Sequence, residues 1–236
     1  MDEKIKEINK KLAQFWDFSQ KLTDENRQEV LESDDRDIRN LAPSEKLYLA
    51  VKSLGKCDKV LDYGCGIGWA SMTAAEGGTK HVKAVDLGEN IIESIKFLSQ
   101  VYGVSDNIEA SVIKENWLEE VSDNSFDGIV CSNVLDVLPL ETSRYIIKQF
   151  SRIAKKDATI VIGLNYYISP EVALKNNMPL ENNKYLFMND ILRLTSLSDQ
   201  EWKDEFSPHF DVQMLDYFAW PGEAKEARRL FILKRK

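Results

Sequence analysis

The sequence predicts an α/β fold in which a parallel sheet is covered by helices on both faces. Short apolar runs alternate with helical stretches between residues 58 and 165, as in chains built from strand–helix–strand units. The runs are almost continuously apolar, which is typical of parallel strands buried on both faces. With 236 residues, the chain is long enough for one large domain, or for one domain with an appended cap.

The N-terminal part of the chain predicts helices. Residues 3–20 carry apolar side chains at helical spacing, namely Ile5, Ile8, Leu12, Phe15 and Trp16. Residues 23–40 are strongly polar and form either a second short helix or a mobile surface segment. Residues 42–56 are typical of a complete helix, which Ser44 can cap and Gly55 can end.

Strands and helices alternate from residue 58 onward. Expected strands span residues 59–64, 81–86, 108–114, 126–133 and 158–165, and expected helices span residues 69–76, 89–103 and 142–156. The helix over residues 89–103 is the clearest, because its apolar residues share one face and Gly103 can end it. Two closing strands, residues 210–220 and 228–236, are joined by a connection short enough for a hairpin.

Residues 166–200 interrupt this alternation. They contain Pro170, Pro179 and several asparagines, and their composition is irregular. An interruption of 35 residues is too long for a plain loop, so we expect it to carry its own structure and to cover a site. Residues 201–206 can form a short helix before the closing strands.

Composition and charge exclude several classes of protein. No run of about 18 apolar residues occurs, so we expect no membrane span, and the N-terminus lacks the apolar core of a signal peptide. The net charge of −8 disfavours nucleic acid as a partner. With only His81 and His209 as histidines, a histidine-rich metal site is unexpected, and we predict no metal. Three cysteines at unrelated spacings predict reduced thiols in a cytoplasmic protein; they are Cys57, Cys65 and Cys131.

The stretch VLDYGCGIGWAS, residues 60–71, predicts a nucleotide-binding turn. A strand that ends at Asp62 is followed by Gly64, Gly66 and Gly68, and then by a helix. Glycines at these places permit positive φ angles and leave no side chain to block a ligand. In an open parallel sheet, ligands bind beyond the carboxyl ends of the strands.

Asp86 ends the second expected strand, 22 residues after Gly64. A carboxylate at this place can accept hydrogen bonds from both hydroxyls of a ribose, and it would repel a 2′-phosphate. We therefore expect a ligand with an adenosine group that lacks this phosphate.

The glycines alone leave NAD, ATP and S-adenosylmethionine (SAM) open. Trp69 stands where the dinucleotide fingerprint has its last glycine, which disfavours NAD. The loop lacks the Lys-Ser/Thr pair of a P-loop, which excludes ATP by that route. Asp62 would repel a pyrophosphate and would suit a cationic amino group. Adenosine, no phosphate and a positive charge together describe SAM.

The motif DYGCGIG matches the pattern DxGxGxG, and the chain resembles class I SAM-dependent methyltransferases over about residues 45–165. The resemblance implies a doubly wound, seven-stranded and mainly parallel sheet whose last strand is antiparallel. It implies SAM as cofactor and S-adenosylhomocysteine as product. Residues 1–42 would then form an N-terminal helical cap or lid, and residues 43–236 the SAM-binding domain, with a substrate-side insertion at about residues 166–200.

The resemblance also implies contacts with the cofactor. Leu87 would lie against adenine, and Glu115 stands where the family usually has an Asp near the adenine amino group. Ser132 and Asn133 follow the fourth strand, where the cofactor and substrate pockets of the family meet. The expected cofactor-binding residues are Asp62, Gly64, Cys65, Gly66, Gly68, Asp86, Leu87, Glu115, Asn116, Trp117, Ser132 and Asn133.

Three residues are candidates for catalysis, although SAM itself carries the driving force and the protein mainly supplies alignment. Asp136 could orient or deprotonate a substrate, or it is a helix cap or a solvated turn residue. Tyr166, just after the fifth strand, either lines the substrate pocket or packs at the strand end. His209 is a possible base or a surface turn residue.

Several aromatic residues also have two interpretations. Phe15 and Trp16 either close over the cofactor or form the apolar face of their helix. Trp202 and Trp220 are either pocket aromatics or core residues, with the core as the default.

The predicted function is transfer of a methyl group from SAM to an oxygen or nitrogen atom of a small molecule. The acidic charge and the insertion favour an enclosed pocket over an open basic groove. SNVLD after the fourth strand also differs from the N/DPPY motif of amino-methylating DNA enzymes. A methyltransferase acting on RNA or protein, and a SAM-binding module without catalysis, remain as alternatives.

Overall fold

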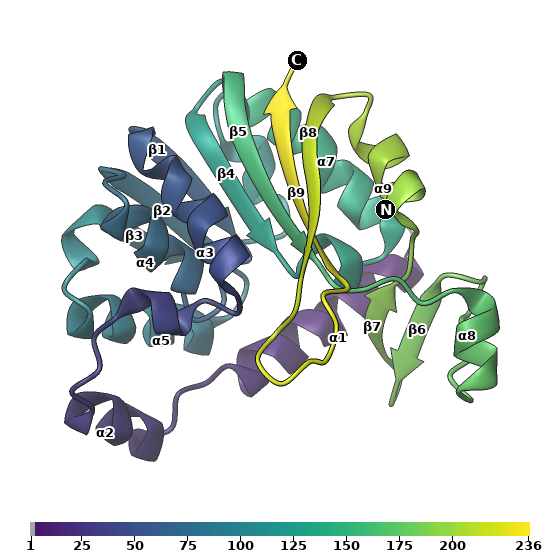
Figure 1. Cartoon of the computed structure of the whole chain (residues 1–236), viewed down its shortest axis with the longest axis horizontal. Helices are drawn as coiled ribbons and strands as arrows, with labels where there is room; N and C mark the ends of the chain where they lie inside the picture. The colour runs from purple at the N-terminus through teal and green to yellow at the C-terminus, as the bar shows by residue number, and fades with distance from the viewer. Residues whose placement is uncertain (1–2) are drawn as a thin grey trace.

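The computed structural model describes residues 3–236, and its centre is a seven-stranded sheet with the strand order β3-β2-β1-β4-β5-β9-β8 (Figure 1). The strands are β1 (Lys59–Tyr63), β2 (His81–Asp86), β3 (Ile108–Val112), β4 (Phe126–Ser132), β5 (Ala154–Leu164), β8 (Phe210–Phe218) and β9 (Arg228–Arg235). Strands β1 to β5 pair in parallel, and β9 is antiparallel to both of its neighbours. The predicted mainly parallel sheet with an antiparallel last strand is confirmed.

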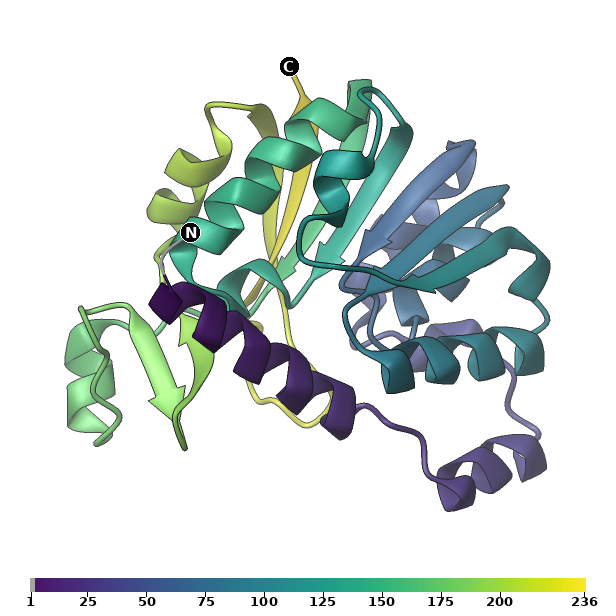
Figure 2. The same ribbon diagram turned by 180° about the vertical axis from the view of Figure 1, so that it is seen from behind.

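Helices cover both faces of this sheet. They are α3 (Glu45–Lys52), α4 (Trp69–Glu76), α5 (Glu89–Val101), α6 (Trp117–Glu120), α7 (Leu140–Ile153) and α9 (Asp199–Phe206). Successive residues of a strand point to opposite faces, so Val60 of β1 packs with α3 and α4, whereas Leu61 packs with α7. Helices α3 and α4 lie in front of the sheet in Figure 1, and α7 and α9 lie in front in Figure 2. The central strands are therefore buried on both faces, as their almost continuously apolar sequences predict.

The predicted boundary between the helix over residues 142–156 and the next strand was wrong. The helix expected over residues 142–156 ends at Ile153, and β5 begins at Ala154 rather than at residue 158. Ala154 pairs with Phe126 of β4, and Lys155 forms an ion pair with Asp127 at 2.7 Å. Strand pairing outweighs the helical propensity of this polar segment, which the local sequence could not reveal.

The order of the strands reverses between β1 and β4. The chain moves outward from β1 to β2 and β3, and it returns with β4 on the other side of β1. In sheets of this type, such a reversal opens a crevice at the carboxyl ends of the two central strands.

The N-terminal helix α1 (Glu3–Ser19) crosses this carboxyl edge of the sheet, as both ribbon views show (Figures 1 and 2). Its Asp17 carboxylate accepts hydrogen bonds from the backbone N–H of Asn90 at 2.8 Å and of Ile91 at 3.3 Å. Asp17 thus caps the N-terminus of α5 with its side chain. The residue that directly precedes this helix is Gly88, which has no side chain to do so. Residues 23–40 contain the short helix α2 (Asp24–Glu32), which lies at the periphery, and a single 3-10 turn (Ile38–Leu41).

The segment over residues 166–200 has its own structure. It contains the helix α8 (Pro170–Lys175) and an antiparallel hairpin of β6 (Tyr185–Met188) and β7 (Ile191–Thr195). Its small core comprises Ile168, Ala173, Leu186 and Leu194. Strand β7 packs beside α1, so the insertion supports the helix that crosses the carboxyl edge.

Candidate active site

The glycine loop turns tightly after β1. The N–H groups of Gly64 and Cys65 both donate to the carbonyl oxygen of Val85, at 2.9 and 3.1 Å, which ties the loop to the end of β2. A Cβ atom on Gly64 (φ +69°) would lie 2.4 Å from Cγ2 of Val134. A Cβ atom on Gly66 (φ +51°) would lie 2.6 Å from Oε1 of Gln20 in the connection after α1. The loop can approach both neighbours only because these residues are glycines.

The Asp86 carboxylate lies beside this loop, at the end of β2. It accepts hydrogen bonds from the backbone N–H of Gly66 at 3.2 Å and of Leu87 at 2.7 Å. Burial raises the pKa of Asp86, and these hydrogen bonds oppose the rise because they favour the charged form. The carboxylate also lines the cavity described next, where a ribose could reach it.

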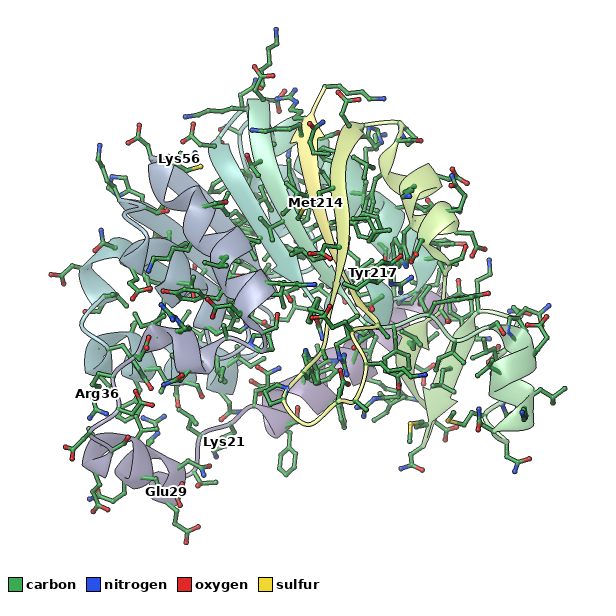
Figure 3. All side chains as sticks on the ribbon, in the orientation of Figure 1. Lys21, Glu29, Arg36, Lys56, Met214 and Tyr217 are labelled. Atoms are coloured by element: carbon green, nitrogen blue, oxygen red, sulfur yellow. The ribbon has the colours of Figure 1, made fainter. Side chains whose placement is uncertain are left out.

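A cavity of about 620 Å³ lies at the carboxyl edge of the sheet. Its volume falls in the range of roughly 300–1,000 Å³ that is common for sites of small ligands and cofactors. The predicted cofactor-binding residues that line it are Gly64, Cys65, Gly66, Asp86, Leu87, Glu115, Ser132 and Asn133. Lys21, in the connection between α1 and α2, lies at its exposed rim (Figure 3).

Four predicted cofactor-binding residues are not part of the cavity wall. Asp62 is buried at the end of β1, where its Oδ2 accepts a hydrogen bond from the Ser71 hydroxyl at 2.6 Å. Burial raises the pKa of Asp62 to about 7. Gly68 directly precedes α4, and a Cβ atom on it would lie 2.4 Å from Cδ1 of Ile95 on α5. Asn116 precedes α6, and Trp117 packs its ring against the main core.

Helix α1 forms one wall of the cavity. Leu12, Ala13 and Trp16 line it, so Trp16 lies where a lid residue is expected. Phe15 does not line the cavity. The guanidinium of Arg193 on β7 lies 4.6 Å from the Phe15 ring and 5.4 Å from the Trp16 ring, which fastens α1 to the insertion.

Sequence reasoning missed the wall formed by the loop after β4 and by α7. The missed residues are Val137, Leu138, Thr142, Tyr145 and Ile146, together with Tyr63 at the end of β1. Their side chains are mostly apolar and lie in or next to regular elements, so nothing in the sequence separates them from core residues. Trp220 also lines the cavity, whereas Trp202 is a core residue without exposed surface.

The structure places Asp136 in the interior of the protein rather than in the cavity wall. Its side chain has 0% of its surface exposed, so the alternative of a solvated turn residue was wrong. Its carboxylate accepts a hydrogen bond from the backbone N–H of Asn165, and the Arg229 guanidinium donates to the carbonyl oxygen of the same residue at 2.8 Å. Asp136 and Arg229 thus hold the end of β5 from two sides.

The other two catalytic candidates also lie outside the cavity wall. Tyr166 is exposed after β5, with the Arg228 guanidinium 5.5 Å from its ring. The backbone carbonyl oxygen of His209 accepts a hydrogen bond from the N–H of Lys236, which directly follows β9. Because β9 runs antiparallel to β5, that end lies at the edge of the sheet opposite the cavity.

Among residues 3–236, no helix is long and apolar enough to span a membrane. Within the same range, no group of three or more His, Cys, Asp or Glu side chains could hold a metal ion.

The residues of the cavity fit SAM. The glycine loop leaves room for backbone approach, Asp86 is available for ribose hydroxyls, and Leu87 offers an apolar surface to adenine. The Asp86 carboxylate in the cavity wall makes the loop region suitable for a cation and unsuitable for a pyrophosphate, and Asp62, buried at the end of β1, adds negative charge when it is ionised.

Comparison with known proteins agrees with this fit. The family model described as "Methyltransferase domain" (Methyltransf_31) matches residues 54–212. The PH0226 protein from Pyrococcus horikoshii OT3 superposes with a TM-score of 0.67 at 17% identity, over 87% of this chain and 93% of that one. This likeness shows the shared fold.

Two curated relatives differ in the acceptors that their names state. The ubiquinone biosynthesis O-methyltransferase of Neisseria meningitidis serogroup A is 28% identical over 102 residues, which are 43% of this chain and 42% of that protein. Protein arginine N-methyltransferase 1 of Saccharomyces cerevisiae is 51% identical over 57 residues, 24% of this chain and 16% of that protein. The matches thus span less than half the length of these relatives. The family model covers most of the chain, so this protein belongs to the methyltransferase-domain family, whose cofactor is SAM.

Proposed function

We propose that this protein transfers the methyl group of SAM to an oxygen or nitrogen atom of a small molecule. The observation that carries the proposal is the shape and chemistry of the cavity. Helix α1 closes one side of it, and Leu12, Leu138 and Ile146 give it apolar walls. Such a cavity suits a small, largely apolar acceptor, whereas a macromolecular acceptor needs an open groove.

We propose that the cofactor occupies the part of the cavity at the ends of β1, β2 and β3. There Asp86 would accept hydrogen bonds from the ribose hydroxyls, and Leu87 and Ile113 would pack against adenine. Bound SAM supplies an activated methyl group on a cationic sulfur, which a nucleophile attacks in line.

The acceptor would then occupy the part of the cavity at the ends of β4 and β5 and the start of β9. The Asn9 side-chain amide donates to the Thr142 hydroxyl at 3.3 Å, and both side chains line the cavity. This pair offers neutral hydrogen-bonding groups in a mainly apolar wall, and we propose that it orients the nucleophilic atom. Alignment in a site shielded from water would be the main contribution of the protein to the rate.

The domain arrangement and location are part of the same proposal. Residues 1–42 would act as the cap of a SAM-binding domain over residues 43–236, with the insertion at about residues 166–200 on the substrate side. The three cysteines of the chain are free thiols, which is consistent with a reducing compartment, and we propose a cytoplasmic location on that ground.

Methyl-labelled SAM and a fractionated cell extract test the function. The purified protein is incubated with low-molecular-weight metabolites, with bulk RNA or with bulk protein, and the label in each fraction is counted. We expect label in the metabolite fraction and none with the Gly66→Leu variant, because a leucine side chain at this place is expected to block the cofactor. Label in RNA or protein instead would establish a macromolecular acceptor. Tight SAM binding without transfer to any fraction would establish a binding module.

A further inference from the structure

The loop between β8 and β9 brings a large aromatic side chain to the cavity. Trp220 lines the cavity, and 38% of its surface is exposed. The loop follows β8 and leads into β9, which pairs with β5. It extends beyond the sheet toward α1 in both ribbon views (Figures 1 and 2). Trp220 therefore lies on the β5 side of the cavity, away from Asp86 and Leu87 at the end of β2.

The indole ring of Trp220 is supported on one face by a fixed cation. The Arg228 guanidinium lies 3.5 Å from the ring centroid, and only 6% of the Arg228 surface is exposed. Both carboxylate oxygens of Glu223 accept hydrogen bonds from this guanidinium, at 2.6 to 3.0 Å, and the Asn165 side chain accepts another. Arg228 is thereby held in place and its charge is neutralised.

The loop backbone is held by the same carboxylate. The N–H of Trp220 donates to Oε2 of Glu223 at 2.9 Å, and the N–H of Glu223 donates to the carbonyl oxygen of Trp220 at 3.0 Å. Lys46 on α3 forms an ion pair with Glu226 at 2.8 Å, which fastens the far end of the loop. The ring is therefore preorganised, and a ligand that stacks on it would lose little entropy in ordering it.

We infer that Trp220 is a specificity-determining residue, which offers its indole face as a stacking surface for a planar, uncharged aromatic acceptor. The inference rests on the proposed function, because it names the class of small molecule that the cavity takes. The paired charges of Arg228 and Glu223 leave no net charge to select a charged acceptor. Leu138 and Ile146, which line the same cavity, are apolar, which favours a ring system over a polar chain.

The test compares two bicyclic alcohols of similar size, planar 2-naphthol and saturated decahydro-2-naphthol. Calorimetry measures their binding to the full chain saturated with S-adenosylhomocysteine. We expect 2-naphthol to bind about three- to tenfold more tightly, because stacking adds to apolar burial. Trp220→Leu is expected to remove this difference, and Trp220→Phe to keep most of it, with the affinity for S-adenosylhomocysteine unchanged in both.

Tyr217→Leu is the matched control. Tyr217 is an exposed aromatic residue on β8, labelled in Figure 3, and it does not line the cavity. This variant is expected to keep the preference for 2-naphthol. Equal binding of both alcohols to the natural protein, or a preference that survives in Trp220→Leu, would overturn the inference.

Binding and methyl transfer separate this inference from the proposed function. If 2-naphthol binding depends on Trp220 but label from SAM enters only RNA or protein, the aromatic site stands and the proposed function fails. If label enters small molecules at equal rates in the natural protein and in Trp220→Leu, for aromatic and saturated alcohols alike, the proposed function stands and the inference fails.

Discussion

Two buried aspartates at the carboxyl edge of the sheet differ in how their charge is compensated. Asp62, at the end of β1, accepts one side-chain hydrogen bond from Ser71, and the neighbouring charge of Asp86 has the same sign. Asp136, after β4, accepts the backbone N–H of Asn165 and lies close to the Arg229 cation. Burial raises the pKa of both carboxyls, but only at Asp136 does a cation oppose the rise.

We propose that the difference separates a residue that a bound cation stabilises, Asp62, from a structural one, Asp136, and neither of the two lines the cavity wall. A buried carboxylate without a cation costs stability, and a ligand that brings a positive charge recovers part of that cost. Asp62 meets this description beside a loop that suits the cation SAM. Asp136 already has its cation within the fold, so its charge contributes to holding β5 in place. Four predictions test this comparison.

The largest effect is expected at Asp136. Asp136→Ala removes the buried carboxylate that accepts the Asn165 N–H and offsets the charge of Arg229, which keeps only Asp199 among the described residues as an ion-pair partner, at 3.5 Å. Loss of one charge from a buried cluster of this kind typically costs about 3–5 kcal/mol. Urea unfolding measures this loss. The double variant Asp136→Leu/Arg229→Met is expected to regain most of the stability and to bind SAM as the natural protein does. Weak SAM binding by a stable double variant would contradict the structural role of the pair.

Asp62→Asn is expected to stabilise the protein at neutral and alkaline pH. The folded pKa of about 7 lies above the usual 3.8. Between these values the folded state keeps a proton that the unfolded state has released. The unfolding free energy of the natural protein therefore falls as the pH rises from about 4 to about 7, by an amount on the order of 4 kcal/mol.

The amide that Asp62→Asn introduces does not titrate, so the variant is expected to lack this loss of stability and to bind SAM more weakly. Urea unfolding from pH 4 to 8 and calorimetry with SAM measure the two effects. An unchanged pH profile of stability would show that Asp62 is not the group that titrates. Unchanged SAM affinity would show that Asp62 does not contribute to SAM binding.

Gly66→Leu tests whether the loop beside Asp62 accepts the cofactor. The left-handed backbone disfavours any side chain at Gly66, and a leucine there would displace the Gln20 side chain and occupy space in the cavity wall, so we expect SAM affinity to fall by about 2 kcal/mol or more. Gly103→Leu is the matched control, since Gly103 has φ +71° but no atom within 4 Å of a Cβ atom. Calorimetry should show normal SAM affinity for the control alone.

The smallest effect is expected at Asp86. Asp86→Ala removes the carboxylate that we propose for ribose recognition, which should weaken SAM binding by about 1–2 kcal/mol. Calorimetry at constant pH measures this change, with Glu109→Ala, an exposed residue on β3 away from the cavity, as the control. Unchanged affinity for SAM in Asp86→Ala would show that ribose recognition lies elsewhere.

Much of the cofactor side of the cavity could be predicted from the sequence. Glycines with positive φ, an acidic residue at the end of the next strand and an apolar residue after it are local features. The spacing of these features predicts the cofactor-binding turn regardless of how the rest of the chain packs. Trp117 shows the limit, because the turn into α6 directs its ring to the core, and the spacing alone could not give that direction.

The catalytic candidates could not be placed in the same way. Asp136 and His209 are residue types that suit proton transfer, but whether they reach a substrate depends on burial and on the direction of distant strands. Asp136 is buried beside Arg229, almost a hundred residues further along the chain, and the antiparallel course of β9 takes the surroundings of His209 to the opposite edge.

The sequence by itself determined the fold class and the identity of the cofactor, because strand periodicity, glycine positions and strand-end carboxylates act over short stretches of chain. The tertiary structure alone decided the part of the cavity in which we propose that the acceptor binds. Its walls come from α1, the loop after β4, α7 and the loop before β9, which meet only when the sheet brings their ends to one edge. Packing also decided which buried aspartate received a cation, since a charge is compensated by its neighbours in space and not by those in sequence.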